Sequence, residues 1–165
     1  MLLYEDIITG DEMFSDAFPI KEVDGVVYEV DCAMIVVGSG NDIDIGANPS
    51  AEEAGEALED GQTQVNNVVH SFRLQSTVFD KKSFLTYLKG YMKAVKGKLP
   101  ADRVSAFETG AQTFAKKIVG NFKDYEFYTG ESMNPDGMVA LLNYREDGVT
   151  PYLTFWKDGL KQVKL

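Results

Sequence analysis

Between residues 80 and 122 the apolar side chains repeat with the period of an α-helix, and runs of strand length flank this segment on both sides. The repeat has two parts, made of Phe84, Tyr87, Leu88, Tyr91, Met92 and Val95 and then of Val104, Phe107, Ala111, Phe114, Ile118 and Phe122. Spacings of three and four residues place each set on one side of a helix. Because only residues 99–102 join them, we expect an antiparallel helical hairpin over residues 80–122, each helix roughly 30 Å long. Asp80 or Ser83 is expected to cap its start, and Gly97 to end its first helix.

The rest of the chain has the pattern of short strands separated by turns. Runs of strand length occur at 2–8, 26–30, 33–37, 138–144 and 152–156. The turn at Asp24-Gly25 predicts a β-hairpin between residues 22–23 and the second run. The whole pattern predicts one α+β domain over residues 1–165, with short mixed β-sheets and the helical hairpin inserted before the closing β-hairpin.

Residues 63–79 return the chain to the sheet. Apolar side chains alternate from Val68 to Leu74, which predicts one long strand. His70, the only histidine, is expected on the apolar or boundary face of that strand. A metal site built on histidines is not predicted, because there is no second histidine.

Residues 38–63 are rich in Gly, Ser, Asn, Asp and Glu, and we expect a long, flexible acidic loop. Read from Asp42, the loop partly follows the EF-hand template, with acids at Asp44 and Glu53. The template fails at Gly46, which has no side-chain ligand, and at Ala47, where the sharp turn needs glycine. Weak Ca²⁺ binding by several carboxylates remains as a hypothesis, and the candidate ligands are Asp42, Asp44, Glu52, Glu53 and Glu56.

Charge is unevenly distributed along a chain whose net charge is −10. Residues 22–72 contain eleven acids and no Lys or Arg, whereas residues 73–123 contain eleven bases and three acids. Six lysines lie outside the apolar stripe, either on the other side of the first helix or just after its end: Lys81, Lys82, Lys89, Lys93, Lys96 and Lys98. Such a run is usually a solvated helix face. The alternative is a surface for an acidic partner, and the argument for it is the shortage of nearby acids.

No sequence motif indicates catalysis. A phosphate loop, a dinucleotide fingerprint, a His/Cys metal cluster and a Ser–His pair are all missing, and nothing brings Glu12, Glu131 and Asp136 together as a carboxylate site. The single cysteine, Cys32, excludes an intrachain disulfide and is expected to be buried and inert. No apolar run reaches the length of a membrane span, and no signal peptide is seen. We therefore expect a cytoplasmic, non-enzymatic binding protein that does not bind nucleic acid.

Four blocks carry a resemblance to a known family. They are NPDGMVALL at 134–142 with YREDG at 144–148, GANPSAE at 46–52, DEMFSD at 11–16 and YMKAVKGKL at 91–99. In this order and at this spacing, the chain resembles the translationally controlled tumour protein family over essentially its whole length.

The resemblance implies a tent-like β core and several binding functions. It implies Ca²⁺ binding and the binding and stabilisation of tubulin and microtubules, whose acidic tails suit a basic hairpin. The alternative that it implies is regulation of a small GTPase of the Rheb or Rab kind, by nucleotide exchange or as a nucleotide-free chaperone. Glu12 in the DEMFSD block and Leu74 are the candidate contacts. Anti-apoptotic partners of the Bcl family, growth regulation and secretion without a signal peptide are further implied properties.

The chain departs from the family pattern in three places. The connection at residues 99–103 is compact, so we expect a tighter helical hairpin. The chain ends in Lys164-Leu165, without the C-terminal cysteine through which some members dimerise. Disulfide dimers of that kind are therefore not expected, and monomer is the state we expect. The acidic loop lacks a long polyacidic run, so no Ca²⁺ stoichiometry is carried over to this chain.

Overall fold

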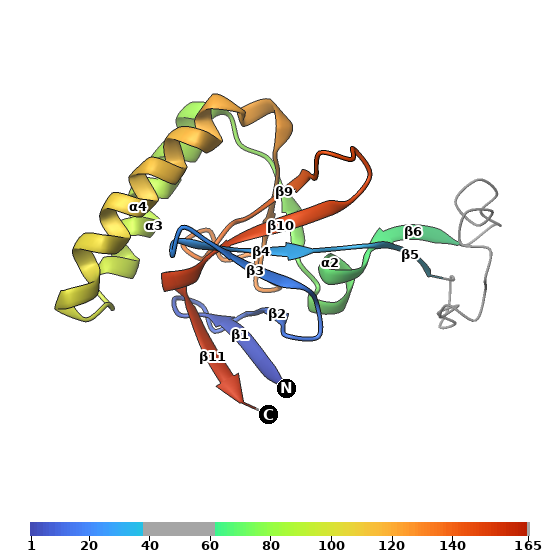
Figure 1. Ribbon diagram of the computed structural model, residues 1–165, viewed down its shortest axis with the longest axis horizontal. Helices are drawn as coiled ribbons and strands as arrows, with labels where there is room; N and C mark the ends of the chain where they lie inside the picture. Colours follow the sequence, from blue (N-terminus) through green and yellow to red (C-terminus); the bar gives the residue numbers. More distant parts are fainter. Residues whose placement is uncertain (38–61, 165) are drawn as a thin grey trace.

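The computed structural model describes residues 1–37 and 62–164, and in these ranges the chain forms an α+β fold, as predicted (Figure 1). The strands are β1 (Leu2–Asp6), β2 (Glu12–Ser15), β3 (Ile20–Val23), β4 (Val27–Asp31), β5 (Met34–Val37), β6 (Thr63–Asn66), β7 (Gln75–Thr77), β8 (Glu126–Thr129), β9 (Ala140–Tyr144), β10 (Pro151–Trp156) and β11 (Leu160–Lys164). Among the described residues they form three sheets, ordered β11-β1-β2, β3-β4-β10-β9-β8-β7 and β5-β6. All pairings between these strands are antiparallel, whereas sheets with both parallel and antiparallel pairings had been predicted.

Strand β10 lies at the centre of the six-stranded sheet, between β4 and β9. Five of its six residues are buried, and it ends in Phe155 and Trp156, which are fully buried. The predicted β3–β4 hairpin is present, and Asp24 and Gly25 both have positive φ at its turn. Two consecutive residues with positive φ give a turn whose twist matches that of the strands, which explains why Asp-Gly stands there.

Aromatic side chains join the three-stranded sheet to the six-stranded sheet. The rings of Tyr4 in β1 and Phe14 in β2 stack with their centroids 4.4 Å apart. Phe14 also lies 4.4 Å from the ring of Phe155 in β10. Buried residues of both sheets and of the helical hairpin belong to one continuous core cluster. The three-stranded sheet therefore closes one side of the core, below the six-stranded sheet in Figure 1.

The helical hairpin consists of α3 (Lys81–Lys96) and α4 (Ala101–Gly120). It connects β7 to β8, two neighbouring strands that pair with each other, so it is an insertion at one edge of the sheet. Asp80 caps α3 and forms a reciprocal pair of hydrogen bonds with Ser83, and Gly97 ends the helix. The predicted apolar stripes are its buried faces: Phe84, Leu88, Tyr91 and Val95 in α3, and Phe107, Ala111, Phe114 and Ile118 in α4.

Residues 63–79 do not form the predicted long strand. Strand β6 ends at Asn66, the short helix α2 (Asn67–Phe72) follows, and β7 begins only at Gln75. The Asn66 side chain accepts hydrogen bonds from the backbone N–H groups of Val68 and Val69, and Arg73 ends the helix with φ of 56°. Asparagine is a strong helix N-cap, and this local capping prevails over the alternating pattern. His70 is consequently exposed on α2, not placed on the face of a strand.

Cys32 is buried, as expected, between β4 and β5. Burial raises the pKa of its thiol to about 11, which keeps it protonated and unreactive at neutral pH. The predicted acidic loop of residues 38–63 lies outside the described residues except at its end, where Gln62 is followed by the first residue of β6. Strands β5 and β6, which flank that segment, pair with each other.

Candidate functional site: a basic helical hairpin

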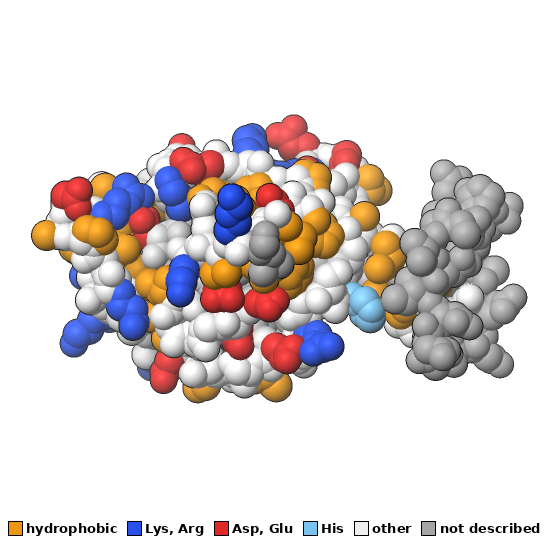
Figure 2. All heavy atoms as spheres, turned by 90° about the horizontal axis from the view of Figure 1, so that it is seen from below, with side chains coloured by type: hydrophobic (Ala, Val, Ile, Leu, Met, Phe, Trp, Pro, Cys, Tyr) orange, Lys and Arg blue, Asp and Glu red, His pale blue; other side chains and the backbone are white. Residues whose placement is uncertain are grey.

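Four of the six lysines predicted as a binding surface are on the outer side of α3. Lys82, Lys89, Lys93 and Lys96 follow one another at intervals of seven, four and three residues, which places them along one line of the helix. Lys82, Lys89 and Lys93 are exposed, and Lys96 is half-buried. Figure 2 shows several Lys and Arg side chains on the hairpin end of the molecule, at the left.

The other two predicted lysines are not part of this line. Lys81 is the first residue of α3, and Lys98 follows the end of that helix. Lys98 lines a different cavity, next to Tyr91. We therefore call Lys82, Lys89, Lys93 and Lys96 the lysine line.

One lysine of α4, Lys116, extends the basic surface and had not been predicted as a site residue. It is exposed and lines the same groove as residues of α3. Its signal in the sequence is that it falls between the apolar residues Phe114 and Ile118, off the buried stripe. Assigning it to the same surface as α3 also required the side-by-side placement of the two helices. The neighbouring Lys117 is exposed as well, but its amine lies 5.2 Å from the centre of the Phe114 ring.

Lys96 is the exception to the expectation that these lysines lack acidic partners. Its Nζ lies 3.1 Å from Oε2 of Glu108 in α4, and both side chains are partly exposed. The pair joins the two helices across the hairpin. Spacing within one helix identifies only acids three or four residues away, so this pair could not be recognised from the sequence. Within the described residues no carboxylate comes within 4.0 Å of the amines of Lys82, Lys89 or Lys93.

A partly buried ion pair fixes the hairpin to the β core. Arg103, in the first turn of α4, donates from Nε and Nη2 to the two carboxylate oxygens of Asp158, at 2.7 and 2.8 Å. Nη2 also donates to the carbonyl of Gly25, at 2.9 Å. The hydrogen bonds to Asp158 raise the pKa of Arg103. Because one guanidinium holds both the β3–β4 turn and the turn after β10, α4 has a defined orientation on the sheet.

Two tyrosines of α3 fix the inner face of the hairpin. The Tyr87 hydroxyl donates to the carbonyl of Gly137 and accepts from the N–H of Val139, at 2.6 and 2.9 Å. The ring of Tyr91 stacks on that of Tyr87 with centroids 5.8 Å apart. Burial raises the pKa of both phenols, so both stay neutral over the physiological range. The inner face is thus rigidly held, and the outer face presents charge.

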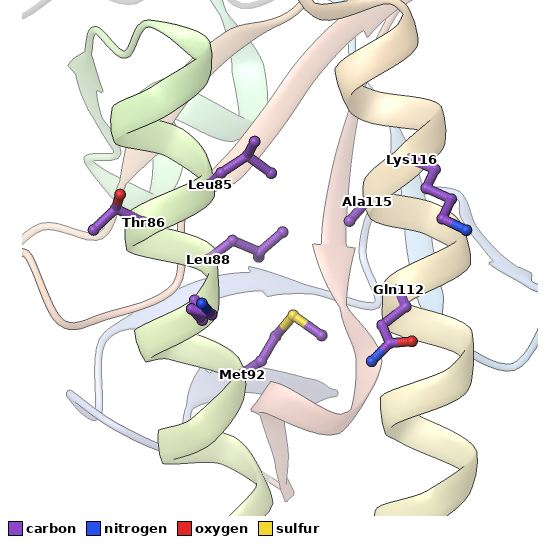
Figure 3. Close-up of a pocket in the computed structure, with 8 residues that line it drawn as sticks. Leu85, Thr86, Leu88, Met92, Gln112, Ala115 and Lys116 are labelled. Carbon is purple, nitrogen blue, oxygen red and sulfur yellow. The ribbon is translucent and has the colours of Figure 1, made fainter.

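A groove of about 480 Å³ runs between α3 and α4 on the outer side of the hairpin. Leu85, Leu88 and Met92 extend from α3 toward α4, and Ala115 faces them from α4 (Figure 3). Lys89 and Lys116 also line the groove, one from each helix. The basic surface therefore contains an apolar depression.

The two candidate GTPase contacts are in different environments. Glu12 is exposed and lines a polar depression of about 430 Å³ together with Asp11, Arg73 and Glu131. Arg73 pairs with Glu131 there at 3.2 Å. Leu74 follows Arg73 in sequence, but its side chain is only 4% exposed. A partner that binds at Glu12 cannot contact the Leu74 side chain in this conformation.

The Ca²⁺ candidates Asp42, Asp44, Glu52, Glu53 and Glu56 lie outside the described residues, and Ca²⁺ binding stays a prediction. In the part of the chain that is described, no group of three or more His, Cys, Asp or Glu side chains could hold a metal ion. None of the described helices is long and apolar enough to cross a membrane.

Comparison with known proteins gives one consistent result. The family model described as "Translationally controlled tumour protein" matches residues 1–161. A translationally-controlled tumor protein homolog of Mycosarcoma maydis is 70% identical over 168 residues, with full coverage of both chains. The homolog of Candida albicans is 65% identical, also with full coverage of both chains.

Solved structures show the same similarity. The translationally controlled tumor-associated protein of Schizosaccharomyces pombe is 60% identical, with a TM-score of 0.84 and full coverage of both chains. The solution structure of the Caenorhabditis elegans protein is 33% identical, with a TM-score of 0.72, and the match covers 100% of this chain and 99% of that one. The similarity thus includes the hairpin as well as the β core.

Proposed function

The chain belongs to the translationally controlled tumour protein family, and from this premise we propose that it is a cytoplasmic binding protein whose helical hairpin docks on acidic segments of tubulin and microtubules. The observation that carries the proposal is the lysine line of α3, in which Lys82, Lys89 and Lys93 are exposed and have no carboxylate partner among the described residues. Unpaired cations on a rigid helix attract an acidic chain without first having to break internal ion pairs. No enzymatic step is part of the proposal.

The proposal is tested by sedimentation with microtubules. Replacing Lys82, Lys89 and Lys93 with Glu should raise the dissociation constant at least about tenfold, because each exposed charge contributes up to about 1 kcal/mol. The matched control replaces Lys21, Lys161 and Lys164 with Glu, since these three exposed lysines of the β core carry the same total charge. Equal weakening by both triple variants would show an effect of net charge only, and unchanged binding of the hairpin variant would remove the proposal.

Salt provides an independent measurement. Contacts between exposed charges weaken as the Debye length falls from about 10 Å at 0.1 M salt to about 3 Å at 1 M. Binding of the wild-type chain to microtubules should therefore decrease steadily with added salt. The hairpin triple variant should show a much flatter dependence. A salt dependence equal to that of the wild type would place the binding charges elsewhere on the molecule.

A second candidate function, regulation of a small GTPase, is favoured by the position of Glu12. This exposed carboxylate lies in a concave polar depression with a cation, Arg73, on a face formed by three separate chain segments. Nucleotide release from Rheb- or Rab-like GTPases should be faster with the wild type than with Glu12→Val. Glu126→Val, at an exposed strand acid, serves as the control. If the wild type does not accelerate release, this candidate function is removed.

A further inference from the structure

The groove on the outer side of the hairpin is apolar at its centre, although it lies within a basic surface. Leu85, Leu88 and Met92 line it from α3, and Ala115 from α4 (Figure 3). Leu85 is 44% exposed, and among the described residues of α3 and α4 it is the most exposed large hydrophobic side chain. Leu88 is buried and belongs to the core. The groove is thus continuous with the core and has a rigid floor.

The dimensions of the groove fit a few side chains. Its volume of about 480 Å³ is within the usual range of ligand pockets. Leu85 and Met92 are seven residues apart, which corresponds to about 10 Å along the helix. Two antiparallel helices form a straight trough between them, and a third helix can lay its apolar side chains into such a trough at positions i, i+4 and i+7.

The charges around the groove indicate which charge its binding partner should carry. Lys89 and Lys116 flank the apolar centre from opposite helices, and none of the described residues that line it is acidic. The hairpin's acid closest to this region in sequence, Glu108, is already paired with Lys96. A second copy of this chain is disfavoured as occupant, because face-to-face packing would bring Lys89 and Lys116 against their own copies.

We propose that this groove binds an acidic amphipathic helix, whose apolar side chains enter between Leu85, Met92 and Ala115 while its carboxylates face Lys89 and Lys116. The inference rests on the proposed function and deepens it, since it states what an acidic partner needs besides charge. A purely acidic tail uses only the lysines. A partner with apolar residues at helical spacing also buries the exposed part of Leu85.

The test uses two labelled peptides of equal charge, both rich in Glu, measured by fluorescence anisotropy. One carries Leu at positions i, i+4 and i+7, and the other carries Ala at the same positions, which keeps charge and helix propensity nearly constant. The Leu peptide should bind the wild-type chain at least about tenfold more tightly than the Ala peptide, because it buries several more methylene groups.

Protein variants locate the effect. Leu85→Ser should reduce the preference for the Leu peptide to less than about threefold, and it should leave binding of the Ala peptide unchanged. Val78→Ser is the matched control, because Val78 lies just before α3 and is 89% exposed. It should retain the full preference. Lys89→Glu combined with Lys116→Glu should weaken both peptides.

Several outcomes overturn the inference. The inference is wrong if the two peptides bind equally well or if neither binds. It is also wrong if Leu85→Ser retains the preference for the Leu peptide, or if Val78→Ser loses that preference too. Self-association through the groove, seen as a concentration-dependent mass that Leu85→Ser abolishes, would also contradict it. Failure here is distinguishable from failure of the proposed function. If microtubule binding is lost in the lysine triple variant while the peptides bind equally, the proposed function stands and the groove inference falls.

Discussion

Arg145 in the β core and three lysines on the helical hairpin are cations in opposite environments. In the core, Arg145 donates to Glu29 and, at 2.9 and 2.7 Å, to Asp31, and its guanidinium lies 4.0 Å from the centre of the Tyr152 ring. On the hairpin, Lys82, Lys89 and Lys93 are exposed and have no carboxylate partner among the described residues. The guanidinium of Arg145 is paired and partly buried, whereas these three amines are exposed and single.

The largest effect expected from this comparison is on stability. Arg145→Met should lower the free energy of unfolding by about 3 kcal/mol, because it leaves the carboxylate of Glu29, whose side chain is 8% exposed, without its cation. Lys89→Met should change it by less than about 0.5 kcal/mol. Urea denaturation of both variants measures the difference. Similar values for the two would contradict the division into structural and binding cations.

A second pair of variants tests how closely the hairpin is seated on the core. A Cβ at Gly110 in α4 would overlap with Cγ2 of Val26, so Gly110→Ala should destabilise by about 1 to 3 kcal/mol. A Cβ at Gly90 in α3 meets nothing within 4 Å, so Gly90→Ala should stabilise by up to about 1 kcal/mol. Thermal unfolding distinguishes the two. If Gly110→Ala also stabilises, the hairpin moves freely enough to accept a methyl group.

The smallest effect expected is a pH dependence at the start of α3. Hydrogen bonds from the Ser83 backbone and side chain lower the pKa of Asp80, so its contribution to stability is complete above its unfolded pKa and is lost as the pH falls through its folded pKa. Asp80→Asn keeps the cap but does not titrate, so the variant should lose less helix than the wild type below about pH 4. Circular dichroism between pH 6 and 2 measures this. Identical acid profiles would show that Asp80 does not contribute.

The sequence predicted those parts of the fold that depend on nearby residues. Helix α3 begins at the predicted Asp80 cap and ends at Gly97, and the β3–β4 turn is at Asp24-Gly25. The wrong prediction of one long strand over residues 63–79 also concerns a local signal. Asn66 was a helix cap, but the alternating apolar residues that follow it were given more weight. Family membership was recognisable from four blocks in order.

The candidate site was predicted less completely, because it depends on residues that are far apart in the chain. The lysines of α3 were recognised, but the pairing of Lys96 with Glu108 and the contribution of Lys116 from α4 were not. Glu12 was predicted as a contact, but its neighbours Arg73 and Glu131 come from distant segments.

The sequence by itself determined the class of fold, the hairpin and its basic character, because periodicity, capping and charge are properties of neighbouring residues. Only the tertiary structure decided which cations are neutralised and where the groove lies. The attraction between two opposite charges weakens as their separation grows, so an ion pair forms only where the two groups lie within a few ångströms. Which groups come that close depends on how the two helices and the sheet are packed. Arg103 illustrates this: its partners Asp158 and Gly25 are 55 and 78 residues away, so only the folded chain brings them together.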